Sequence, residues 1–274
     1  MNLWLITVNF GNTRSTSELI NSVSIIEGAN SIKIVVADNQ TSPQSTEELK
    51  KIKRDSTLDI SFFTYKQNYY YWPAAKKTLS ALIQQLNDYP DWIMICNNDI
   101  SFQDKDFLKK LKDIDSKKYP IIGPDISTPN GNKLNPFMLS ELSFAEKSFW
   151  WMYFRSYLLS LVLLKLKSFI NSIFPKSKVE NQSFFQKVYA IHGSAILLSK
   201  YFFIRGGSLD DNFDMYGEEM SVAEIAKSLK IPITYCPKIK IMHHEHSITK
   251  NINKKLLFNK AKESYEYIKS AYKK

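Results

Sequence analysis

The segment Trp92–Asp99 places a carboxylate directly after an apolar run, in the order Trp-Ile-Met-Ile-Cys-Asn-Asn-Asp. A carboxylate at the end of a buried parallel strand can hold a hard divalent cation, which can in turn bind the oxygens of a diphosphate. Asp99 could equally begin a turn, because aspartate is common there. On this segment alone, both interpretations stay open.

Two further polar residues follow apolar runs near the N-terminus. Asn9 follows Leu3–Val8, and Asp38 follows Ile32–Ala37. If these runs are neighbouring parallel strands, their carboxyl ends meet at one edge of a sheet, and a single ligand could contact both residues and Asp99. An aspartate there can accept a hydrogen bond from a base N–H or a ribose hydroxyl. Each residue alone is also explained as part of a turn.

Two adjacent carboxylates, Glu218 and Glu219, follow Gly217 and precede a helical pattern. Negative charge is favoured at a helix N-terminus, which is the structural explanation for the pair. The functional explanation is a general base that removes a proton from an acceptor hydroxyl. A glycine just before the pair suits a backbone that comes close to a ligand.

The segment His243–His246 contains three histidines and one glutamate after a predicted strand. Imidazole and carboxylate groups at this density can bind a metal ion. The spacing is not that of a zinc finger, and the His-Glu-x-x-His order of helical zinc proteases is absent. A cluster of histidines on the surface is the alternative.

These positions need a sheet to hold them, and the hydrophobic pattern of the first half predicts one. The predicted strands are Leu3–Phe10, Ile32–Ala37, Leu58–Tyr65 and Trp92–Cys96, and the predicted helices are Ser15–Gly28, Thr46–Lys53 and Pro73–Leu86. Such alternation is typical of a parallel, doubly wound sheet whose ligands lie at the carboxyl edge. The less regular second half predicts strands over Ile121–Pro124, Val188–Leu198, Ile233–Tyr235 and Ile239–Met242, and helices over Met220–Leu229 and Lys254–Tyr272.

Composition sets the broad class of the protein. With 274 residues, 44% of them hydrophobic, and only 8 glycines and 10 prolines, the chain suits one α/β domain and excludes a disordered or fibrous protein. The net charge of +10 favours phosphate-bearing partners, whether nucleic acid, nucleotide diphosphates or anionic lipids. Two cysteines, Cys96 and Cys236, exclude a disulfide framework and fit a reducing cytoplasm. The N-terminus lacks the pattern of a signal peptide, and no apolar run reaches the roughly 18–20 residues of a membrane span.

The segment Phe149–Ile170 is rich in aromatic and aliphatic residues, with Arg155, Lys165 and Lys167 between them. Aromatic residues at one end and interspersed basic residues are typical of a helix that lies in the headgroup layer of a membrane. Lys165 and Lys167 could reach anionic headgroups. The segment therefore predicts peripheral contact with the anionic inner membrane, and the alternative is a buried helix pair or a dimer contact.

Taken in order, several short motifs give the chain a family resemblance. It resembles the inverting family 2 glycosyltransferases of the GT-A fold, especially the bacterial branch of rhamnosyl-, galactosyl- and galactofuranosyltransferase-like proteins. The motifs are Thr7–Asn12, Val35–Asn39, Asn97–Asp99, His192–Leu198, Gly206–Glu219 and the late His243. They span nearly the whole chain. The resemblance implies a Rossmann-like, mostly parallel sheet flanked by helices, with an aromatic-rich helical insertion at about residues 145–175 and a C-terminal helix.

The resemblance also implies residue roles. Glu219 would match the catalytic base, with Glu218 as the second choice. Asp99 and His243 would hold a divalent metal ion, Mg²⁺ or Mn²⁺. The donor, a nucleotide-diphosphate sugar, would be held by residues that follow the predicted strands and turns: Asn9, Asp38, Asn68, Asn97, Asn98 and Gly193.

The sequence departs from the family pattern at three places. Small residues usually follow the position of Asn68, whereas this chain has the bulky run Tyr69–Lys77. The base position is usually aspartate, and Glu219 is one methylene longer. The arginine that commonly follows the base is missing, because its position falls near Ile225. The first departure concerns the pocket for the donor sugar.

The implied activity is inverting transfer of a hexosyl or pentosyl group from a nucleotide-diphosphate sugar to a saccharide acceptor, with a lipid-linked acceptor in bacterial surface polysaccharide synthesis. We expect a single domain with a nucleotide-binding half over residues 1–125, an acceptor and catalytic half over 126–250, and a basic helix over 251–274. One alternative is a nucleotidyltransferase, which would need a glycine-rich phosphate loop, and Asn9–Arg14 is a poor one. The other is a non-catalytic nucleic-acid-binding protein, although the aromatic residues near Trp150 are mixed with leucine and valine and no nucleic acid is expected.

Overall fold

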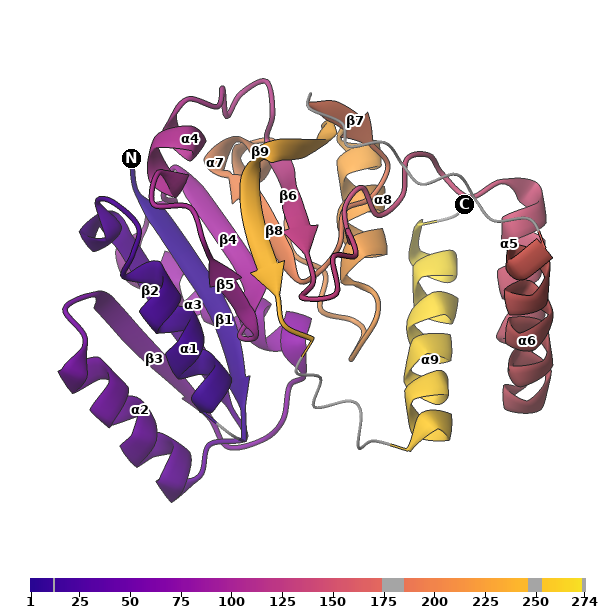
Figure 1. Ribbon diagram of the computed structural model, residues 1–274, viewed down its shortest axis with the longest axis horizontal. Coiled ribbons are helices and arrows are strands. Elements are labelled where there is room, and N and C mark those ends of the chain that lie inside the picture. The colour runs from indigo at the N-terminus through magenta and orange to yellow at the C-terminus, as the bar shows by residue number, and fades with distance from the viewer. Residues whose placement is uncertain (12, 174–184, 246–252, 273–274) are drawn as a thin grey trace.

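The nine described strands form one mixed sheet, and helices cover both of its faces (Figure 1). The structure is a computed structural model that describes residues 1–11, 13–173, 185–245 and 253–272. The strands are β1 (Leu3–Phe10), β2 (Ile32–Asn39), β3 (Asp59–Tyr65), β4 (Trp92–Asn97), β5 (Ile100–Phe102), β6 (Ile121–Ser127), β7 (Gln186–Val188), β8 (Ala195–Ser199) and β9 (Ile233–His243). The helices are α1 (Arg14–Val23), η1 (Ala29–Ser31), α2 (Pro43–Asp55), α3 (Tyr71–Leu86), α4 (Phe107–Lys112), α5 (Phe144–Tyr153), α6 (Tyr157–Ile173), α7 (Lys200–Ile204), α8 (Glu218–Ser228) and α9 (Lys254–Tyr272).

The strand order is β3-β2-β1-β4-β8-β6-β9-β5, and β7 also pairs with β9. Neighbouring strands among β1 to β4 are parallel. β8 is antiparallel to both β4 and β6, and β9 is parallel to β6. β6 and β9 therefore run in the same direction as the first four strands. The predicted mostly parallel sheet flanked by helices is confirmed.

Side chains of the central strands alternate between two core layers, as the two-residue period of a strand requires. Leu5 and Met94 pack on one face with residues of α1, α2 and α4. Ile6 and Ile95 pack on the other face with residues of α3, α7 and α8. All four side chains are fully buried. Burial on both faces explains why these strands are continuous apolar runs in the sequence.

Some predicted boundaries were wrong. The helix expected over Ser15–Gly28 ends at Val23, and Gly28 has a φ of 77°, a left-handed conformation that glycine adopts without strain. The single strand expected over Val188–Leu198 is divided into β7 and β8, with residues 189–194 between them. Conversely, one strand, β9, replaces the two expected over 233–242, because a register shift against β6 accommodates its extra residues.

The helices α5 and α6 form a hairpin beside α9, at one end of the molecule (Figure 1). Aromatic rings of the hairpin, from Tyr153, Phe154 and Tyr157, contact Phe258 and Tyr265 of α9. The predicted aromatic helical insertion and C-terminal helix are thus both present. Within the described residues, no helix combines the length and the apolar character that crossing a membrane requires.

Candidate active site

Polar side chains from four strands meet at the carboxyl edge of the sheet. In the strand register, Asn9 lies opposite Asp38, and Val8, directly before Asn9, lies opposite Asn97. His243 lies opposite Ile100. The expectation that the strand-end residues share one edge is confirmed. The last member of the predicted histidine cluster, His246, lies outside the described residues, as does Asn12 of the first motif.

Asn9 and Asp38 form a buried hydrogen-bond network. Asn9 Nδ2 donates to Asp38 Oδ1 at 2.8 Å, and Asn9 Oδ1 accepts from Thr16 Oγ1 at 2.8 Å. Ser45 Oγ donates to Asp38 Oδ2 at 2.9 Å, and Asn98 Nδ2 donates to Thr16 Oγ1 at 3.1 Å. Both carboxylate oxygens of Asp38 are therefore engaged within the protein, and its role toward a nucleotide stays a prediction.

Asn68 fixes the loop that leads into α3. Its Oδ1 accepts from Asn39 Nδ2 and from the Tyr70 backbone N–H, both at 2.7 Å. Asn39 Oδ1 accepts from the Tyr69 backbone N–H at 2.8 Å. Tyr70 has a φ of 60°, which is rare for a bulky residue and is maintained by these hydrogen bonds. Strained backbone of this kind is common where a loop must present groups to a ligand.

Asp99 and His243 form the pair that could hold a metal ion. His243 Nε2 lies 3.1 Å from Asp99 Oδ1, and the two side chains are only 11% and 10% exposed. Adjacent ligands of an octahedral ion lie about 3 Å apart when the bonds are about 2.1 Å long, so the pair has the separation of two ligands to one ion. Asn97 Nδ2 lies 3.4 Å from the same imidazole nitrogen. In the described part of the chain, no group of three or more histidine, cysteine, aspartate or glutamate side chains could hold a metal, so further ligands would come from substrate or water.

Glu218 and Glu219 begin α8 and face the turn before β8. Glu219 Oε1 accepts from the Gly193 backbone N–H at 3.0 Å, and Glu218 Oε2 accepts from the Gly217 backbone N–H at 3.0 Å. Desolvation raises the pKa of both carboxyl groups, and the nearby charge of Glu218 contributes to raising the pKa of Glu219 to about 8. A carboxylate with a pKa near the working pH is suited to act as a general base.

Gly193, in the turn before β8, lies against this carboxyl pair. A Cβ atom there would lie 2.5 Å from Glu218 Cγ and 2.8 Å from Glu219 Oε1.

We therefore expect Gly193→Ala to displace both glutamates and to lower the activity proposed below by at least tenfold. A 1 Å displacement of catalytic groups can cost about 100-fold. The melting temperature should fall as well, because small-to-large changes in packed sites cost roughly 1–3 kcal/mol. Activity assays and differential scanning calorimetry test both expectations. Gly207→Ala is the matched control, because its added Cβ would lie 2.5 Å from the Phe202 ring and so clashes without touching either glutamate. Wild-type activity in Gly193→Ala would contradict the expectation that close packing at Gly193 positions the two glutamates.

The structure brings in two residues that were given no role from the sequence. Tyr71, at the start of α3, donates its hydroxyl hydrogen bond to the Gly193 carbonyl at 3.0 Å. Burial raises the pKa of Tyr71 well above its usual value, and Cys96, Glu218, Glu219 and Asp99 raise it further. Tyr71 therefore fixes the backbone at Gly193, whose N–H donates to Glu219. The bulky Tyr69–Lys77 run was the available signal for Tyr71.

The second such residue is His192. Its ring centroid lies 6.1 Å from that of His243, and its backbone N–H donates to Asn135 Oδ1 at 2.8 Å. The sequence did contain a signal for a role of His192, because this residue begins the motif His192–Leu198 and directly precedes Gly193.

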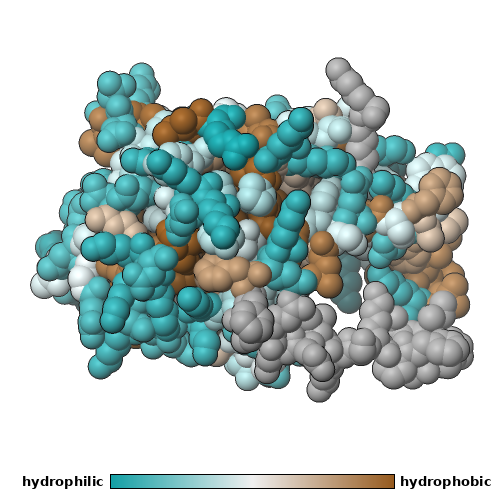
Figure 2. All heavy atoms as spheres, turned by 90° about the horizontal axis from the view of Figure 1, so that it is seen from above, coloured by the Kyte–Doolittle hydropathy of each residue, from teal (hydrophilic) through white to brown (hydrophobic). Residues whose placement is uncertain are grey.

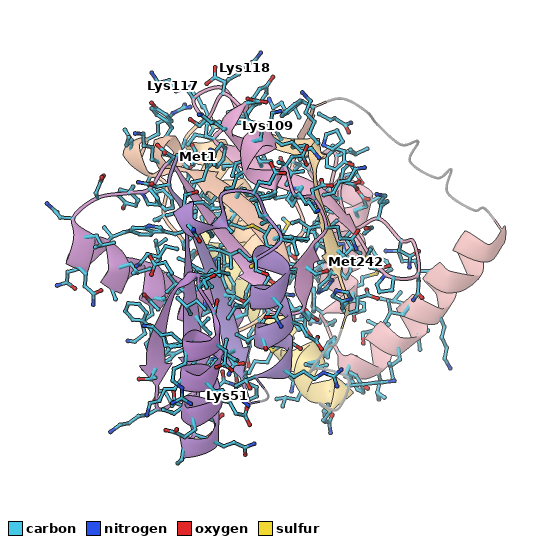
Figure 3. All side chains as sticks on the ribbon, turned by 60° about the vertical axis from the view of Figure 1, so that its left-hand side comes forward. Met1, Lys51, Lys109, Lys117, Lys118 and Met242 are labelled. Carbon is cyan, nitrogen blue, oxygen red and sulfur yellow. The ribbon has the colours of Figure 1, made fainter. Side chains whose placement is uncertain are left out.

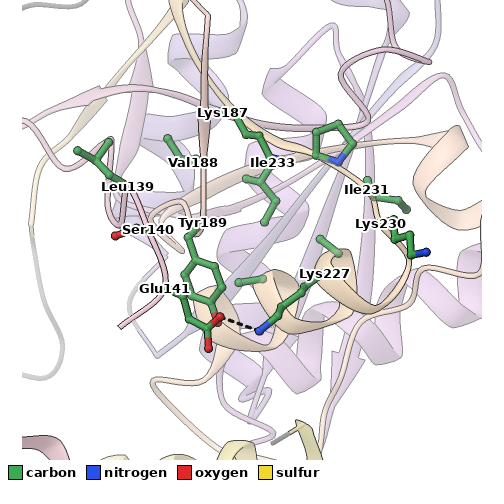
Figure 4. A pocket seen from close by; sticks show the side chains of 13 residues that line it. Leu139, Ser140, Glu141, Lys187, Val188, Tyr189, Lys227, Lys230, Ile231 and Ile233 are labelled. Atoms are coloured by element: carbon green, nitrogen blue, oxygen red, sulfur yellow. Dashed lines mark hydrogen bonds and ion pairs between the residues drawn. The ribbon is translucent and has the colours of Figure 1, made fainter. Parts of the chain in front are cut away.

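A separate cavity of about 580 Å³ lies away from this site (Figure 4). It is lined by Tyr189 of the segment after β7, by Ala223 and Lys227 of α8, and by Ile233 at the start of β9. Lys227 is paired there with Glu141 at 2.7 Å. These α8 residues follow the first turn of the helix, which carries Glu218 and Glu219, so this cavity is distinct from the carboxylate and histidine site.

No known family profile matches the sequence, and no curated protein sequence is significantly similar to it. Solved structures do match. TarS from S. aureus superposes with a TM-score of 0.56 over 89% of this chain at 12% identity. A mannosyltransferase from Pyrobaculum calidifontis, solved with GDP-Man and Mn²⁺, gives 0.55 over 99% at 9% identity. GalNAc-T7, solved with UDP, GalNAc and Mn²⁺, gives 0.58 over 89% at 11% identity.

The chain has the GT-A glycosyltransferase fold. All three identities are low, so the similarity is one of architecture. The match covers 37% of the TarS chain, 44% of the GalNAc-T7 chain and 70% of the mannosyltransferase chain. This chain thus spans less than half the length of two of these proteins.

Proposed function

We propose that the protein is an inverting glycosyltransferase that moves a sugar from a nucleotide diphosphate to an acceptor hydroxyl. The observation that carries the proposal is the pairing of a carboxylate–imidazole site, Asp99 and His243, with a carboxyl pair, Glu218 and Glu219, through contacts of the adjacent residues 192 and 193. Transfer with inversion needs two such groups. One neutralises the leaving diphosphate, and the other accepts the proton of the attacking hydroxyl.

Asp99 and His243 would hold the divalent ion, Mg²⁺ or Mn²⁺. The ion supplies positive charge to the oxygens of the departing diphosphate. Two protein ligands are enough, because such ions keep waters and take further oxygen ligands from substrate phosphates. Asn97, beside His243, and the network of Asn9, Asp38 and Asn98 would hold the nucleotide side of the donor.

Glu219 is the proposed base. Its carboxyl group accepts from the Gly193 N–H, and the raised pKa of about 8 gives it affinity for a proton. Direct displacement by the acceptor oxygen breaks the bond between the anomeric carbon and the diphosphate oxygen and forms the new glycosidic bond. The acceptor proton passes to Glu219, and the configuration at the anomeric carbon inverts.

Binding of nucleotide sugars tests the proposal without knowledge of the acceptor. Thermal unfolding is measured with UDP-, GDP- and dTDP-sugars, each with and without Mn²⁺. A ligand at 100 times its dissociation constant stabilises the folded state by about 2.7 kcal/mol. We expect one nucleotide sugar to raise the melting temperature in a metal-dependent manner. The absence of any metal-dependent shift across the panel would refute the proposal.

For the acceptor, we propose a lipid-linked saccharide presented at an anionic membrane surface, in surface polysaccharide synthesis on the cytoplasmic face. The support is the outer face of the α5–α6 hairpin. Trp151, Leu158, Val162 and Leu166 are between 52% and 75% exposed. Figure 2 shows apolar surface at the end of the molecule that the hairpin occupies. An apolar patch of this kind marks an interaction surface.

The charges of the hairpin favour anionic lipid over a second copy of the chain. Residues 144–167 contain four cationic side chains and one anionic side chain, Glu146. Arg155 lies over the Trp151 ring at 5.8 Å, and Lys167 lies over Phe149 and Trp150 at 5.0 and 5.3 Å. Two such basic surfaces would repel each other. Anionic headgroups, in contrast, attract the hairpin with roughly 1 kcal/mol of binding free energy for each basic residue near the membrane surface.

We expect Leu158→Ser with Val162→Ser to reduce cosedimentation with phosphatidylglycerol-containing vesicles severalfold at low salt. Both exposed side chains would otherwise enter the interface. The matched control is Leu86→Ser with Ile204→Ser, which removes two exposed apolar side chains elsewhere. Equal binding by both double variants would contradict the assignment. So would a wild-type dimer in light scattering that the hairpin variant abolishes.

The nucleic-acid alternative expects basic residues gathered on one face. Figure 3 shows Lys109, Lys117 and Lys118 projecting at one end of the molecule and Lys51 at the opposite end. This spread favours a general basic surface over a nucleic-acid groove. The nucleotidyltransferase alternative predicts release of pyrophosphate from a nucleoside triphosphate, and the same binding panel extended to triphosphates distinguishes it.

A further inference from the structure

His192 lies between the two halves of the proposed site. Its ring is adjacent to that of His243, one of the two proposed metal ligands, with 6.1 Å between the centroids. The next residue, Gly193, donates its N–H to Glu219, the proposed base, at 3.0 Å. Two adjacent residues therefore contact both halves of the site: the side chain of His192 contacts the proposed metal ligand His243, and the backbone of Gly193 contacts the proposed base Glu219.

The hydrogen bonds of His192 fix which nitrogen carries the proton. Its Nδ1 accepts from the Ser194 backbone N–H at 3.2 Å and lies 2.9 Å from Ser194 Oγ. A backbone N–H can only donate, so Nδ1 is unprotonated and the proton of the neutral ring is on Nε2.

The ring is also held in place. Asn135 Oδ1 accepts from the His192 backbone N–H at 2.8 Å, and Phe137 packs edge-on against the ring at 5.6 Å. In contrast to Nδ1, the Nε2–H has no hydrogen-bond partner within the residues that the structure describes. A rigid, neutral donor without a protein partner beside a reaction site is a group that a ligand can satisfy.

We propose that His192 determines donor specificity by donating its Nε2–H to a hydroxyl of the transferred sugar. The inference rests on the proposed function. In a direct displacement, the sugar must lie between the diphosphate held by the metal and the hydroxyl activated by the base, which is where His192 lies. A neutral imidazole offers one directional hydrogen bond, which suits a hydroxyl, whereas a diphosphate is better matched by the cation at Asp99 and His243.

Three substitutions separate this role from a structural one. His192→Gln places an amide N–H near the position of Nε2 but has no acceptor near Nδ1. His192→Asn places an amide oxygen near Nδ1 but has no donor near Nε2. His192→Phe keeps a planar ring for packing against Phe137 and has neither group.

The experiment measures dissociation constants by calorimetry, with Mn²⁺, for the nucleotide sugar that stabilises the wild type and for the matching nucleotide diphosphate. We expect Asn and Phe to weaken nucleotide-sugar binding by about tenfold, the effect of one lost neutral hydrogen bond. Gln should stay within a few-fold of wild type. All three should bind the nucleotide diphosphate as the wild type does. Deoxy analogues of the sugar should identify the hydroxyl, because wild type would discriminate against one of them and His192→Asn would not.

Each other result has a distinct meaning. Full-strength sugar binding by His192→Asn would overturn the inference and leave the proposed function intact. An equal loss for the nucleotide diphosphate would also overturn it, because His192 would then act through His243. If wild type bound neither nucleotide sugar nor nucleotide diphosphate, the proposed function would fail and this inference with it. Melting temperatures of the variants show whether each one is folded.

Discussion

Replacement of Glu219 by glutamine is expected to lower the rate of sugar transfer by about 10²–10⁴-fold, the usual contribution of a general base. Glutamine has nearly the same shape and can still accept from the Gly193 N–H, but it cannot take a proton from the acceptor hydroxyl. Binding of the nucleotide sugar should be unchanged, because the donor contacts lie at the strand ends. The measurement is kcat with saturating donor, beside a calorimetric dissociation constant for the donor.

The pH dependence gives an independent readout. The base must be deprotonated, so kcat/KM of the wild type should rise with pH and reach half its maximum near pH 8, the value to which burial and Glu218 raise the pKa of Glu219. The glutamine variant should lose this titration. A group whose folded pKa lies above its unfolded value contributes stability that is lost as pH rises through the folded pKa. The variant should therefore be at least as stable as wild type above pH 8. Glu47→Gln, on the surface of α2, is the control.

Two results would count against Glu219. One is near-normal turnover in Glu219→Gln, and the other is a larger loss in Glu218→Gln with the pH profile also removed. The second outcome would transfer the role to Glu218, whose carboxyl pKa is also raised by burial.

Replacement of Asp99 by asparagine is expected to lower kcat/KM by roughly 10²–10³-fold at fixed Mn²⁺, since a metal ion supplies several kcal/mol of charge stabilisation to the leaving group. Asparagine keeps an oxygen near His243 Nε2 but removes the negative charge that would hold the ion. Chelation should abolish wild-type activity, and added Mn²⁺ should restore it. Higher Mn²⁺ should recover part of the activity of the variant.

Binding of Mn²⁺ can be followed by electron paramagnetic resonance in the presence of a nucleotide diphosphate, which separates metal affinity from turnover. Asp113→Asn, at the C-terminus of α4 and exposed, is the matched control. Wild-type activity that survives complete chelation would rule out the metal, and unchanged Mn²⁺ binding in Asp99→Asn would move the ligand elsewhere.

The strands β1, β2 and β4 could be predicted from the sequence because they are buried on both faces. Runs such as Leu3–Phe10 and Trp92–Cys96 have an apolar side chain at nearly every position, and they match β1 and β4 closely. The edge at which Asn9, Asp38 and Asn97 meet follows from parallel pairing alone. The second half was harder to predict because its pairings are distant and partly antiparallel. Gly193 and Ser194 are typical of a turn, but nothing in Val188–Leu198 indicates that β7 and β8 pair with different neighbours.

The site shows the same division. The candidate base and metal ligands could be named from their residue types. The contacts that give them their properties could not, because they join positions far apart in the chain. Tyr71 reaches Gly193 across 122 positions, and Asn97 reaches His243 across 146. Similarly, the burial that raises the Glu219 pKa is a property of the packed site.

The place of β8 in the sheet also affects how the chain is made. β8 covers the free edge of β4, yet Ala195 follows Asn97 by 98 positions. At about 5–20 residues per second, the ribosome leaves that edge unpaired for roughly 5–20 s after β4 emerges. The edge belongs to the run Trp92–Cys96, whose backbone groups and apolar side chains are then open to other nascent chains. The pairing of β8, which follows the turn at Gly193, thus also closes an apolar edge that could aggregate, and chaperones that hold this nascent segment should raise the yield of folded protein.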